Sequence, residues 1–393
     1  MRKETKKAPT IRFRGFTDDW EQRKLSKVVS VCSGMDYKHL STGNIPVYGT
    51  GGYMLSVNKA LSYDRDAIGI GRKGTIDKPY ILRAPFWTVD TLFYAIPQNE
   101  ECIDFVYDLF QNVDWKKKDE STGVPSLSKV AINNTNVIIP SEAEQRKIGS
   151  FTSQLDILLT LHQRKLDQLK KLKKYFLQNM FPTKGEKVPR IRFKGFTGDW
   201  KQRKFGEIAE YKKGPFGSAL KKDFFIPDSA TSVKVYEQQN AINKNWNLSR
   251  YYISKEYAQK LKSFEVHAGD IIVSCAGTIG EIYELPAQSR SGIINQALMR
   301  IRVDEETVCK DIFKLSFSNM IDSFSREFSN GSAIKNIPPF ADLKPMKVLL
   351  PNKDEQKIIG DFFTDIDKTI TLHQRKLNQL QTMKKFMLQN LFI

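Results

Sequence analysis

Two short motifs in the sequence have the residue types of cofactor sites. Gly69-Ile-Gly-Arg-Lys-Gly74 has the glycine spacing of a dinucleotide-binding loop, which requires a helix that opens directly after the last glycine. Asp77-Lys-Pro79 follows instead, and its proline disfavours that helix. Asn336-Ile-Pro-Pro-Phe340 has the outline of the Asn-Pro-Pro-aromatic motif used in amino-group methylation, but the isoleucine interrupts it and no glycine-rich loop accompanies it. We therefore expect no catalytic residue and no cofactor in this chain.

The cysteines do not have the spacing of a metal site or a disulfide framework. Cys32, Cys102, Cys275 and Cys309 stand far apart, without a Cys-x-x-Cys pair, so we expect buried thiols and no bound metal. The N-terminus lacks the apolar stretch of a secretory signal, and no run of about 18 apolar residues occurs. These features predict a cytoplasmic protein without a membrane partner.

Cationic and amide side chains gather beside glycines and aromatics in the loop-like parts of the chain. The formal net charge of +18 makes a polyanion the expected partner. Lysine and arginine suit phosphates and guanine, whereas glutamine and asparagine can pair with adenine. For any one of these residues, a solvated surface role fits the pattern as well as DNA contact does. The candidate DNA-binding residues are Lys38, Thr50, Tyr53, Arg72, Lys73, Lys78, Lys212, Lys213, Phe216, Ser218, Lys221, Lys222, Gln238, Gln239 and Asn240.

The chain contains an internal sequence repeat in two copies. Residues 11–24 recur at 191–204 with 11 of 14 positions identical, and residues 140–181 recur at 351–392. A repeat of this kind sets the architecture, because both copies must fold alike. We therefore expect a pseudo-two-fold molecule in which each copy has a short motif, a variable domain and a long helical segment.

The positive charge lies mainly in the repeated segments. Counting Lys+Arg minus Asp+Glu gives 12−12 for residues 25–140 and 19−17 for residues 205–351, but 16−6 for residues 141–204. The surface of the first variable domain must then be locally basic, or the repeats must supply much of the attraction to phosphates.

The second repeated segment predicts a long helix in each copy. Ser141-x-x-Glu144 and Asn352-x-x-Glu355 have the form of a capping box, in which the cap side chain and the glutamate satisfy each other's free N–H groups. Apolar residues then follow with the 3–4 spacing of a coiled-coil seam. They are Ile148, Phe151, Leu155, Leu158, Leu169, Leu172 and Phe176 in the first copy, and Ile359, Phe362, Ile366, Leu380, Met383 and Met387 in the second.

At the centre of each helix we expect the seam to be interrupted. His162 and Lys165 take seam positions there, while Leu161 and Leu166 move to the side, and the second copy repeats this at His373. A polar pair that fixes the register is the simplest interpretation of the two histidines. Contact with a partner subunit is the alternative, since two histidines alone make a poor metal ligand set.

The variable segments have the lengths of single domains and mix strand-like runs with turns. Each predicts an α/β domain with a curved β-sheet, whose last strand at Asn136–Pro140 or Lys347–Pro351 leads into the helix. The expected fold is therefore α/β, with two globular domains separated by two long coiled-coil helices. The expected boundaries are 1–140 and 182–351 for the domains, and 141–181 and 352–393 for the helices.

This arrangement resembles the specificity subunits of type I restriction-modification systems over essentially the whole chain. The motifs that carry the resemblance are the I-R-F-x-G-F-x-x-x-W opening, Ala268-Gly-Asp-Ile-Ile-Val-Ser with Ala276-Gly-Thr-Ile-Gly, Ile294-Asn-Gln-Ala-Leu-Met-Arg-Ile, the E-Q-[RK] helix starts and the F-L-Q-N-M-F and M-L-Q-N-L-F helix ends. The resemblance implies a non-catalytic subunit in which each domain reads one half of a split, asymmetric site in double-stranded DNA. It also implies that the two long coiled-coil helices are an antiparallel pair that spaces the two recognition domains. These helices would bind two methyltransferase subunits, through which restriction subunits join the complex. We expect the partner-binding residues to be His162, Phe176, Met180, His373, Met387 and Leu391.

Two other classes of protein are weighed against this one. A self-sufficient DNA methyltransferase or nuclease would need cofactor or metal motifs, which the sequence does not show. An architectural coiled-coil DNA binder would explain the charge and the helices, but not two dissimilar domains of more than 100 residues each.

Overall fold

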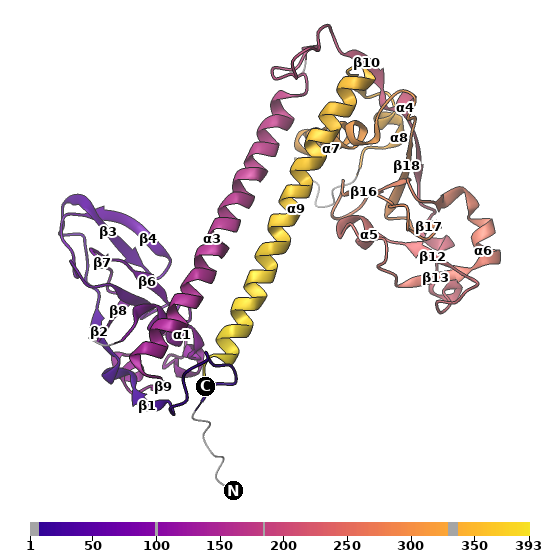
Figure 1. Cartoon of the computed structure of the whole chain (residues 1–393). Helices are drawn as coiled ribbons and strands as arrows, with labels where there is room; N and C mark the ends of the chain where they lie inside the picture. Colours follow the sequence, from indigo (N-terminus) through magenta and orange to yellow (C-terminus); the bar gives the residue numbers. More distant parts are fainter. Residues whose placement is uncertain (1–7, 99–100, 184, 329–336) are drawn as a thin grey trace. The chain divides into compact units, whose positions relative to one another are not determined.

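The computed structural model describes residues 8–98, 101–183, 185–328 and 337–393, and the chain folds into two compact units (Figure 1). Unit 1 comprises Met1–Asp167 and Thr371–Ile393, and unit 2 comprises Gln168–Ile370. Each unit therefore contains one globular head together with part of each long helix. No described helix is long and apolar enough to cross a membrane.

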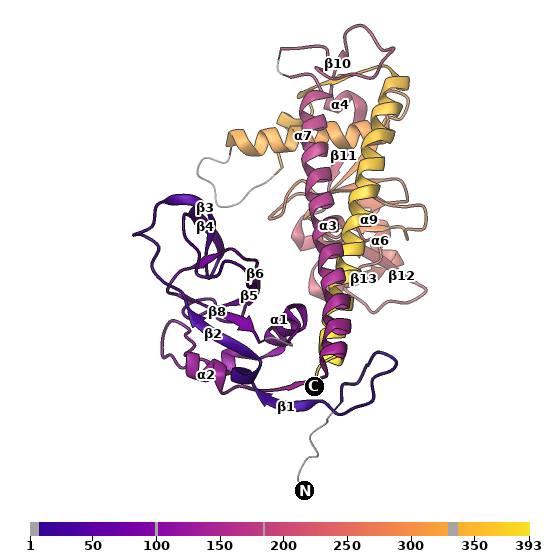
Figure 2. The ribbon, with the colours of Figure 1, turned by 60° about the vertical axis from the view of Figure 1, so that its left-hand side comes forward.

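The head of unit 1 has two small β-sheets (Figure 2). An antiparallel sheet has the order β2-β8-β5-β6, and its inner strand β5 is buried along its whole length. The second sheet has the order β4-β3-β7. The strands are β1 (Glu21–Lys24), β2 (Val29–Ser33), β3 (Thr42–Gly49), β4 (Gly52–Val57), β5 (Ala67–Gly71), β6 (Tyr80–Leu82), β7 (Trp87–Thr88), β8 (Leu92–Pro97) and β9 (Asn136–Ile139); the helices are η1 (Leu25–Lys27), α1 (Ile103–Asn112), η2 (Trp115–Lys118) and α2 (Lys129–Asn133).

The head of unit 2 repeats this plan with additions. Its first sheet has the order β11-β18-β15-β16, again antiparallel with a buried inner strand, and its second has the order β13-β12-β17-β14. The strands are β10 (Lys201–Lys204), β11 (Ala209–Lys213), β12 (Ser232–Tyr236), β13 (Tyr251–Ser254), β14 (Glu265–Val266), β15 (Ile271–Ser274), β16 (Ile282–Glu284), β17 (Gly292–Ile294), β18 (Leu298–Val303) and β19 (Lys347–Leu350). The helices are α4 (Phe205–Ile208), η3 (Gly217–Ala219), η4 (Lys222–Phe224), α5 (Gln238–Ile242), α6 (Lys255–Lys260), η5 (Lys262–Phe264), α7 (Lys310–Phe328) and α8 (Phe340–Leu343). The predicted mixture of helix and sheet is confirmed in both heads.

Each repeated motif forms a short strand that closes its own unit. Strand β1 pairs with β9, and β10 pairs with β19, both antiparallel. Strands β9 and β19 lead directly into the long helices α3 (Glu142–Asn179) and α9 (Lys353–Asn390), as the sequence predicts. The repeated residues therefore fasten each head to the start of its helix.

The capping-box prediction is half wrong. Asn352 Oδ1 does accept a hydrogen bond from the Glu355 N–H at 2.9 Å, as a cap should. The glutamates, however, are buried and bind arginines of the repeated motifs. Arg12 donates two hydrogen bonds of 2.8 Å to Glu144, and Arg192 donates two of 2.7 Å to Glu355. A bidentate guanidinium neutralises a buried carboxylate better than a single N–H does, so the glutamate turns towards the arginine.

The next residue of each helix ties it to the head. Gln145 accepts a hydrogen bond from the Cys102 N–H at 3.2 Å, and Gln356 accepts one from the Cys309 N–H at 2.8 Å. Cys102 directly precedes helix α1, and Cys309 directly precedes helix α7. The N–H groups at the start of a helix have no partner within it, so the two glutamine side chains satisfy one such group in each head. The Glu-Gln pair that the two helix starts share thus has one structural role in both units.

Within each unit, the parts of the two long helices pack antiparallel, as predicted in kind but not in register. Along each helix, the seam residues follow one another at intervals of three and four. In α3 they are Leu155, Leu159, His162, Leu166, Leu169, Lys173, Phe176 and Met180; in α9 they are Ile366, Ile370, His373, Leu377, Leu380, Lys384, Met387 and Leu391. The expected interruption is therefore wrong: Leu166 is buried in the seam, and Lys165 is exposed.

Ion pairs explain the lysines in this seam. In unit 2, Lys173 Nζ lies 2.6 and 2.8 Å from the carboxylate oxygens of Asp367. In unit 1, Lys384 makes the same contacts with Asp156. A lysine can bury its aliphatic stem between helices when its ammonium reaches a carboxylate at the edge. The residues expected at these places, Leu172 and Met383, are exposed instead.

The end of each long helix contacts a repeated motif. In unit 1, the Ile11 N–H donates to the Asn390 carbonyl at 2.9 Å, and the Trp20 ring packs edge-on against Phe392. In unit 2, the Ile191 N–H donates to the Asn179 carbonyl at 2.9 Å in the same way. The C-terminal end of the described chain thus lies beside the first repeated motif, as a pseudo-two-fold repeat requires.

Candidate nucleic-acid interface

Three loops meet at one edge of the four-stranded sheet in unit 1. The end of β2 pairs with the start of β8 at Ser33 and Phe93, and the end of β5 pairs there at Gly71 and Leu92. The Arg72 and Lys73 N–H groups both point to the Thr91 carbonyl, at 2.8 and 3.4 Å. This backbone anchor holds the loop while both side chains remain exposed.

The predicted cationic residues of unit 1 lie in these loops. Lys38 is exposed in the loop after β2, and Lys78 is exposed in the loop between β5 and β6. Gly74 has a φ of +85°, and the chain then runs to strand β6 rather than into a helix. The structure thus confirms that the glycine motif at 69–74 is a strand followed by a loop.

The β3–β4 hairpin joins the same edge. The Tyr80 hydroxyl, at the start of β6, donates to the Gly49 carbonyl at 2.6 Å. The two remaining candidates of unit 1 flank this turn: Thr50 is half-buried, and Tyr53 is exposed. A contiguous surface with exposed cations, a hydroxyl and a tyrosine results.

Unit 2 presents an equivalent edge with different side chains. The Gly214 N–H donates to the Leu298 carbonyl at 2.9 Å, and Ser274 at the end of β15 pairs with the same Leu298. Gly277 has a φ of +69° at the place that Gly74 takes in unit 1. The loops 214–220, 275–281 and 295–297 therefore share one edge, and they carry or adjoin the predicted residues. Of these, Lys213, Phe216, Ser218, Lys221 and Lys222 are exposed, and Lys212 is half-buried with its ammonium 4.9 Å from the centre of the Phe264 ring.

The three consecutive amides of α5 differ in their environments. Gln238 Nε2 donates to the carbonyl oxygens of Ala276 and Thr278, at 2.6 and 3.2 Å, so it braces the loop beside it. Gln239 is exposed. Asn240 is buried, and its amide caps the Glu237 N–H and binds the Asn245 and Leu248 carbonyls. Contact between Asn240 and DNA stays a prediction that this burial does not favour, because its hydrogen-bonding groups are used inside the head.

The structure gives no support for a methylation, metal or disulfide site at the other motifs of the sequence. Asn336 lies outside the described residues, and Phe340 begins α8 and packs against Tyr211. Within the described part of the chain, no three His, Cys, Asp or Glu residues are placed to hold a metal. The four cysteines are free thiols, but only Cys275 is buried and the others are half-buried, so that expectation is correct for one of the four.

The six residues expected to bind a partner lie in the helix seam or in the cores. His162 and His373 face each other, Phe176 packs against Phe362 with ring centres 5.0 Å apart, and Met180 and Leu391 are buried. Met387 is half-buried against the core of unit 1. Contact between these side chains and a partner stays a prediction that their burial does not favour.

Other apolar side chains of the helices lie beside the seam and are exposed. They include Met383 and Phe386 of α9 in unit 1, and Leu172 and Tyr175 of α3 in unit 2, which occupy the matching positions of the repeat. The signal was present in the sequence as apolar residues one position beside the seam. The assignment of Leu172 and Met383 to the seam concealed it.

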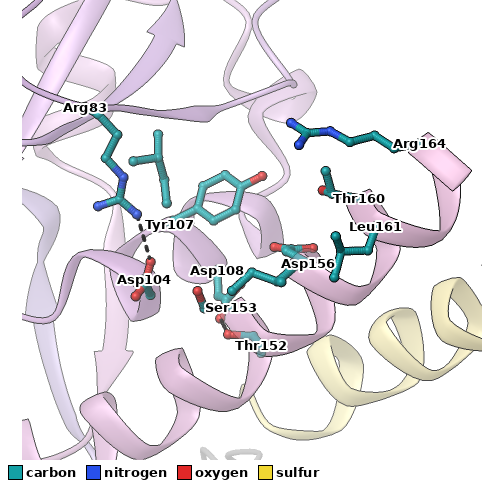
Figure 3. A pocket seen from close by; sticks show the side chains of 12 residues that line it. Arg83, Asp104, Tyr107, Asp108, Thr152, Ser153, Asp156, Thr160, Leu161 and Arg164 are labelled. Carbon is teal, nitrogen blue, oxygen red and sulfur yellow. Dashed lines mark hydrogen bonds and ion pairs between the residues drawn. The ribbon is translucent and has the colours of Figure 1, made fainter.

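A cavity of about 360 Å³ lies between α1 and α3 in unit 1 (Figure 3). At its base the Thr152 hydroxyl donates to the Asp108 carboxylate at 2.5 Å. Burial raises the pKa of Asp108 to about 7. The helix-start contacts place Leu315 and Phe363 of unit 2 where Asp108 and Thr152 stand, so the two units differ here in polarity.

A duplicated scaffold with two different loop surfaces is the architecture of a two-headed recognition protein. The family model described as "Type I restriction modification DNA specificity domain" matches residues 17–171 and 197–382. The chain belongs to this family.

Individual relatives agree with this assignment. The chain is 23% identical over 282 residues to the type I restriction enzyme MjaVIII specificity subunit of Methanocaldococcus jannaschii, and 24% identical over 266 residues to the putative MjaX specificity subunit of the same organism. These matches cover 69% and 66% of this chain, and span 64% and 59% of the length of those relatives.

Solved structures share the fold. The S subunit of a type I restriction-modification system from M. genitalium matches with a TM-score of 0.69 and 13% identity, over 98% of this chain and 99% of that chain. A chain from a structural study of type I R-M complex assembly matches with a TM-score of 0.52 and 14% identity, over 94% and 96%. At these identities the likeness establishes the two-headed fold.

Proposed function

We propose that this chain is the DNA-sequence-recognition subunit of a type I restriction-modification complex. The single observation that carries the proposal is the equivalent sheet edge of the two units. Gly74 and Gly277 turn the chain at matching places and are both followed by Thr-Ile, yet Arg72 and Lys73 before the first glycine have Cys275 and Ala276 as their counterparts. One scaffold with two sets of loop residues is what the reading of two different sequences requires.

Each head reads one half of a split, asymmetric site in double-stranded DNA. Arg72, Lys73 and Lys213 are exposed at these edges and can contact phosphates or guanine edges in the major groove. The loops are held by backbone hydrogen bonds to the neighbouring strands, so little entropy is lost when they bind. We propose residues 25–140 and 205–351 as the two recognition segments, and 141–181 and 352–393 as the helices that space them.

The helices bind two methyltransferase subunits through equivalent surfaces. Met383 and Phe386 of unit 1 occupy the same repeat positions as Leu172 and Tyr175 of unit 2, and all four are exposed. Apolar and aromatic residues exposed together mark protein-binding surfaces more than scattered single ones do. One such surface in each unit supports two identical partners, and restriction subunits would join through them.

The chain directs catalysis in the cytoplasm and performs none itself. We expect the purified chain to leave DNA unmethylated and uncut when it is mixed with labelled methyl donor, a divalent cation and DNA. Methyl transfer or cleavage without a partner would favour the self-sufficient enzyme instead.

Methylome sequencing of a host that carries this chain with its methyltransferase partner tests the proposed function. We expect one split motif, both halves of which disappear when the chain is deleted. A chimaera in which residues 205–351 come from a relative should change one half only. A change in both halves would contradict the two-headed reading, and footprinting without a discrete protected site would favour an architectural DNA binder.

A further inference from the structure

The loop after β11 exposes a phenylalanine to an unusual degree. Phe216 is 90% exposed, whereas no other large hydrophobic residue that the structure describes exceeds 65%. Single apolar residues at a surface are common, but most are half covered by their neighbours. Because removing so much apolar surface from water is favourable, we expect this side chain to be buried in a complex.

The loop is braced so that this side chain cannot fold back. A Cβ atom on Gly214 would lie 1.8 Å from the Asn295 carbonyl oxygen, so the chain passes directly against that turn. Pro215 is buried and has a restricted φ. After the tip, the Ala219 N–H donates to the Phe216 carbonyl at 2.9 Å, and Leu220 is buried. Phe216 is therefore presented in one place before any partner arrives.

Cations flank the loop on both sides. Lys213 precedes it, Lys221 and Lys222 follow it, and all three are exposed. Within the described chain, none of the three has a carboxylate within ion-pair distance. Duplex DNA is a polyanion whose stacked bases present apolar faces between its phosphates. An apolar ring flanked by unpaired ammonium groups therefore matches its chemistry.

The corresponding loop of unit 1 has no aromatic residue at the position of Phe216. It starts at Gly34, whose N–H donates to the Leu92 carbonyl at 3.1 Å, as Gly214 does to Leu298. Met35 and Asp36 then stand where unit 2 has Pro215 and Phe216. A carboxylate at the tip would be repelled by DNA, so the two heads treat their half-sites differently.

We infer that Phe216 inserts between adjacent bases of the half-site bound by unit 2, so that this head selects a base step that opens easily. This inference rests on the proposed function. Apolar wedges unstack base steps and kink the duplex, and pyrimidine–purine steps yield most readily. The half-site of unit 2 is thus selected in part by deformability, at a step that Phe216 opens without hydrogen bonds to its base edges.

The test uses the full chain with its methyltransferase partner and a duplex that carries the motif found by methylome sequencing. 2-Aminopurine, which brightens when it loses stacking, is placed in turn at each step of both half-sites. We expect one bright step, in the half-site that changes in the 205–351 chimaera. Phe216→Ala should abolish this signal and weaken binding about tenfold or more. Phe216→Leu should keep part of both, since leucine also serves as a wedge.

Two comparisons make the result specific. Met35→Ala, in the matching loop of unit 1, should leave the bright step unchanged. The salt dependence of binding should stay the same in Phe216→Ala, because no charge is removed, but should fall in Lys221→Ala. If Phe216→Ala binds the same site with unchanged affinity and fluorescence, the inference is overturned and the proposed function stands. If the unaltered complex recognises no discrete site, both fail.

Discussion

The imidazole rings of His162 and His373 face each other in the seam of unit 1, with their Nδ1 atoms 2.9 Å apart. A hydrogen bond at this distance needs one donor and one acceptor, so at least one ring is neutral. Leu166 and Leu377 are buried one step further along the same seam. A polar pair among apolar layers is satisfied in only one register, and so it specifies how the helices align.

Replacing one histidine should therefore cost more than replacing both. His162→Leu leaves the His373 Nδ1 without its partner, and we expect a loss of about 1–3 kcal/mol in the free energy of unfolding. The double change, with His373→Leu, should recover most of this because no unpaired group remains. Urea unfolding measures both, with exposed Lys165→Leu as the control. Equal losses in the single and double variants would contradict a register-fixing pair.

The buried carboxyl of Asp108 should make the first unit sensitive to pH. Burial raises its pKa to about 7, well above the usual 3.8 of an aspartate side chain. In the folded state it holds its proton to higher pH than in the unfolded state, so stability should fall as pH rises from about 4 to about 7, and level off above. The full penalty corresponds to up to about 4 kcal/mol.

Asp108→Asn should remove this pH dependence. The amide keeps an oxygen that can accept from Thr152 but bears no charge, so the variant should melt higher than the unaltered protein at pH 8 and similarly at pH 4. Thermal melts at several pH values measure this. Asp119→Asn is the control, since hydrogen bonds from the Ser126 and Ser121 N–H groups lower the pKa of that half-buried carboxyl. An unchanged pH profile in Asp108→Asn would show that this carboxyl does not set it.

Much of this architecture was accessible from the sequence, and the failures have physical causes. The repeats predicted both helix starts, because their Glu-Gln pairs and prolines are local signals. The seam register was misassigned because Leu158 and Leu159 are both apolar, and because Lys173 occupies a seam position only through Asp367, nearly 200 residues away. The burial of Asn240 could not be predicted, because three adjacent amides cannot be told apart until the fold turns one of them inward.

A circularly permuted chain should keep its DNA specificity. Ile11 binds Asn390 in unit 1 as Ile191 binds Asn179 in unit 2, so a linker from Ile393 to the N-terminus would copy the natural connection at 182–190. Reopening the chain within 182–190 should then preserve both heads. Methylome sequencing with the permuted chain should return the same motif. Loss of folding would contradict the equivalence of the two connections.

Exposed residues of the helices should control assembly one partner at a time. Phe386→Asp in unit 1 and Tyr175→Asp in unit 2 should each remove one methyltransferase subunit, and the pair should remove both, since a carboxylate in an apolar contact is costly. Native mass spectrometry counts the subunits. Phe176→Asp is a poorer probe, because Phe176 packs on Phe362 and the change would destabilise the fold.

Changes at the sheet edge of unit 1 should affect DNA binding but not assembly, and so they serve as a control for the helix variants. Arg72→Ala with Lys73→Ala should weaken DNA binding and leave both methyltransferase subunits attached, because these side chains lie in a loop of the head. A folded Phe386→Asp, Tyr175→Asp variant that still carries two partners would place the docking surface elsewhere.

The closure of unit 1 by residues 371–393 has a consequence for biosynthesis. The first head leaves the ribosome early, but Leu391 and Phe392, which complete its core, emerge last. Unit 2 is continuous in sequence and has all its residues before that moment. A translating chain therefore holds a finished second head and an unfinished first one. Premature termination just after Ile370 would release a protein in which only the second head has all of its residues.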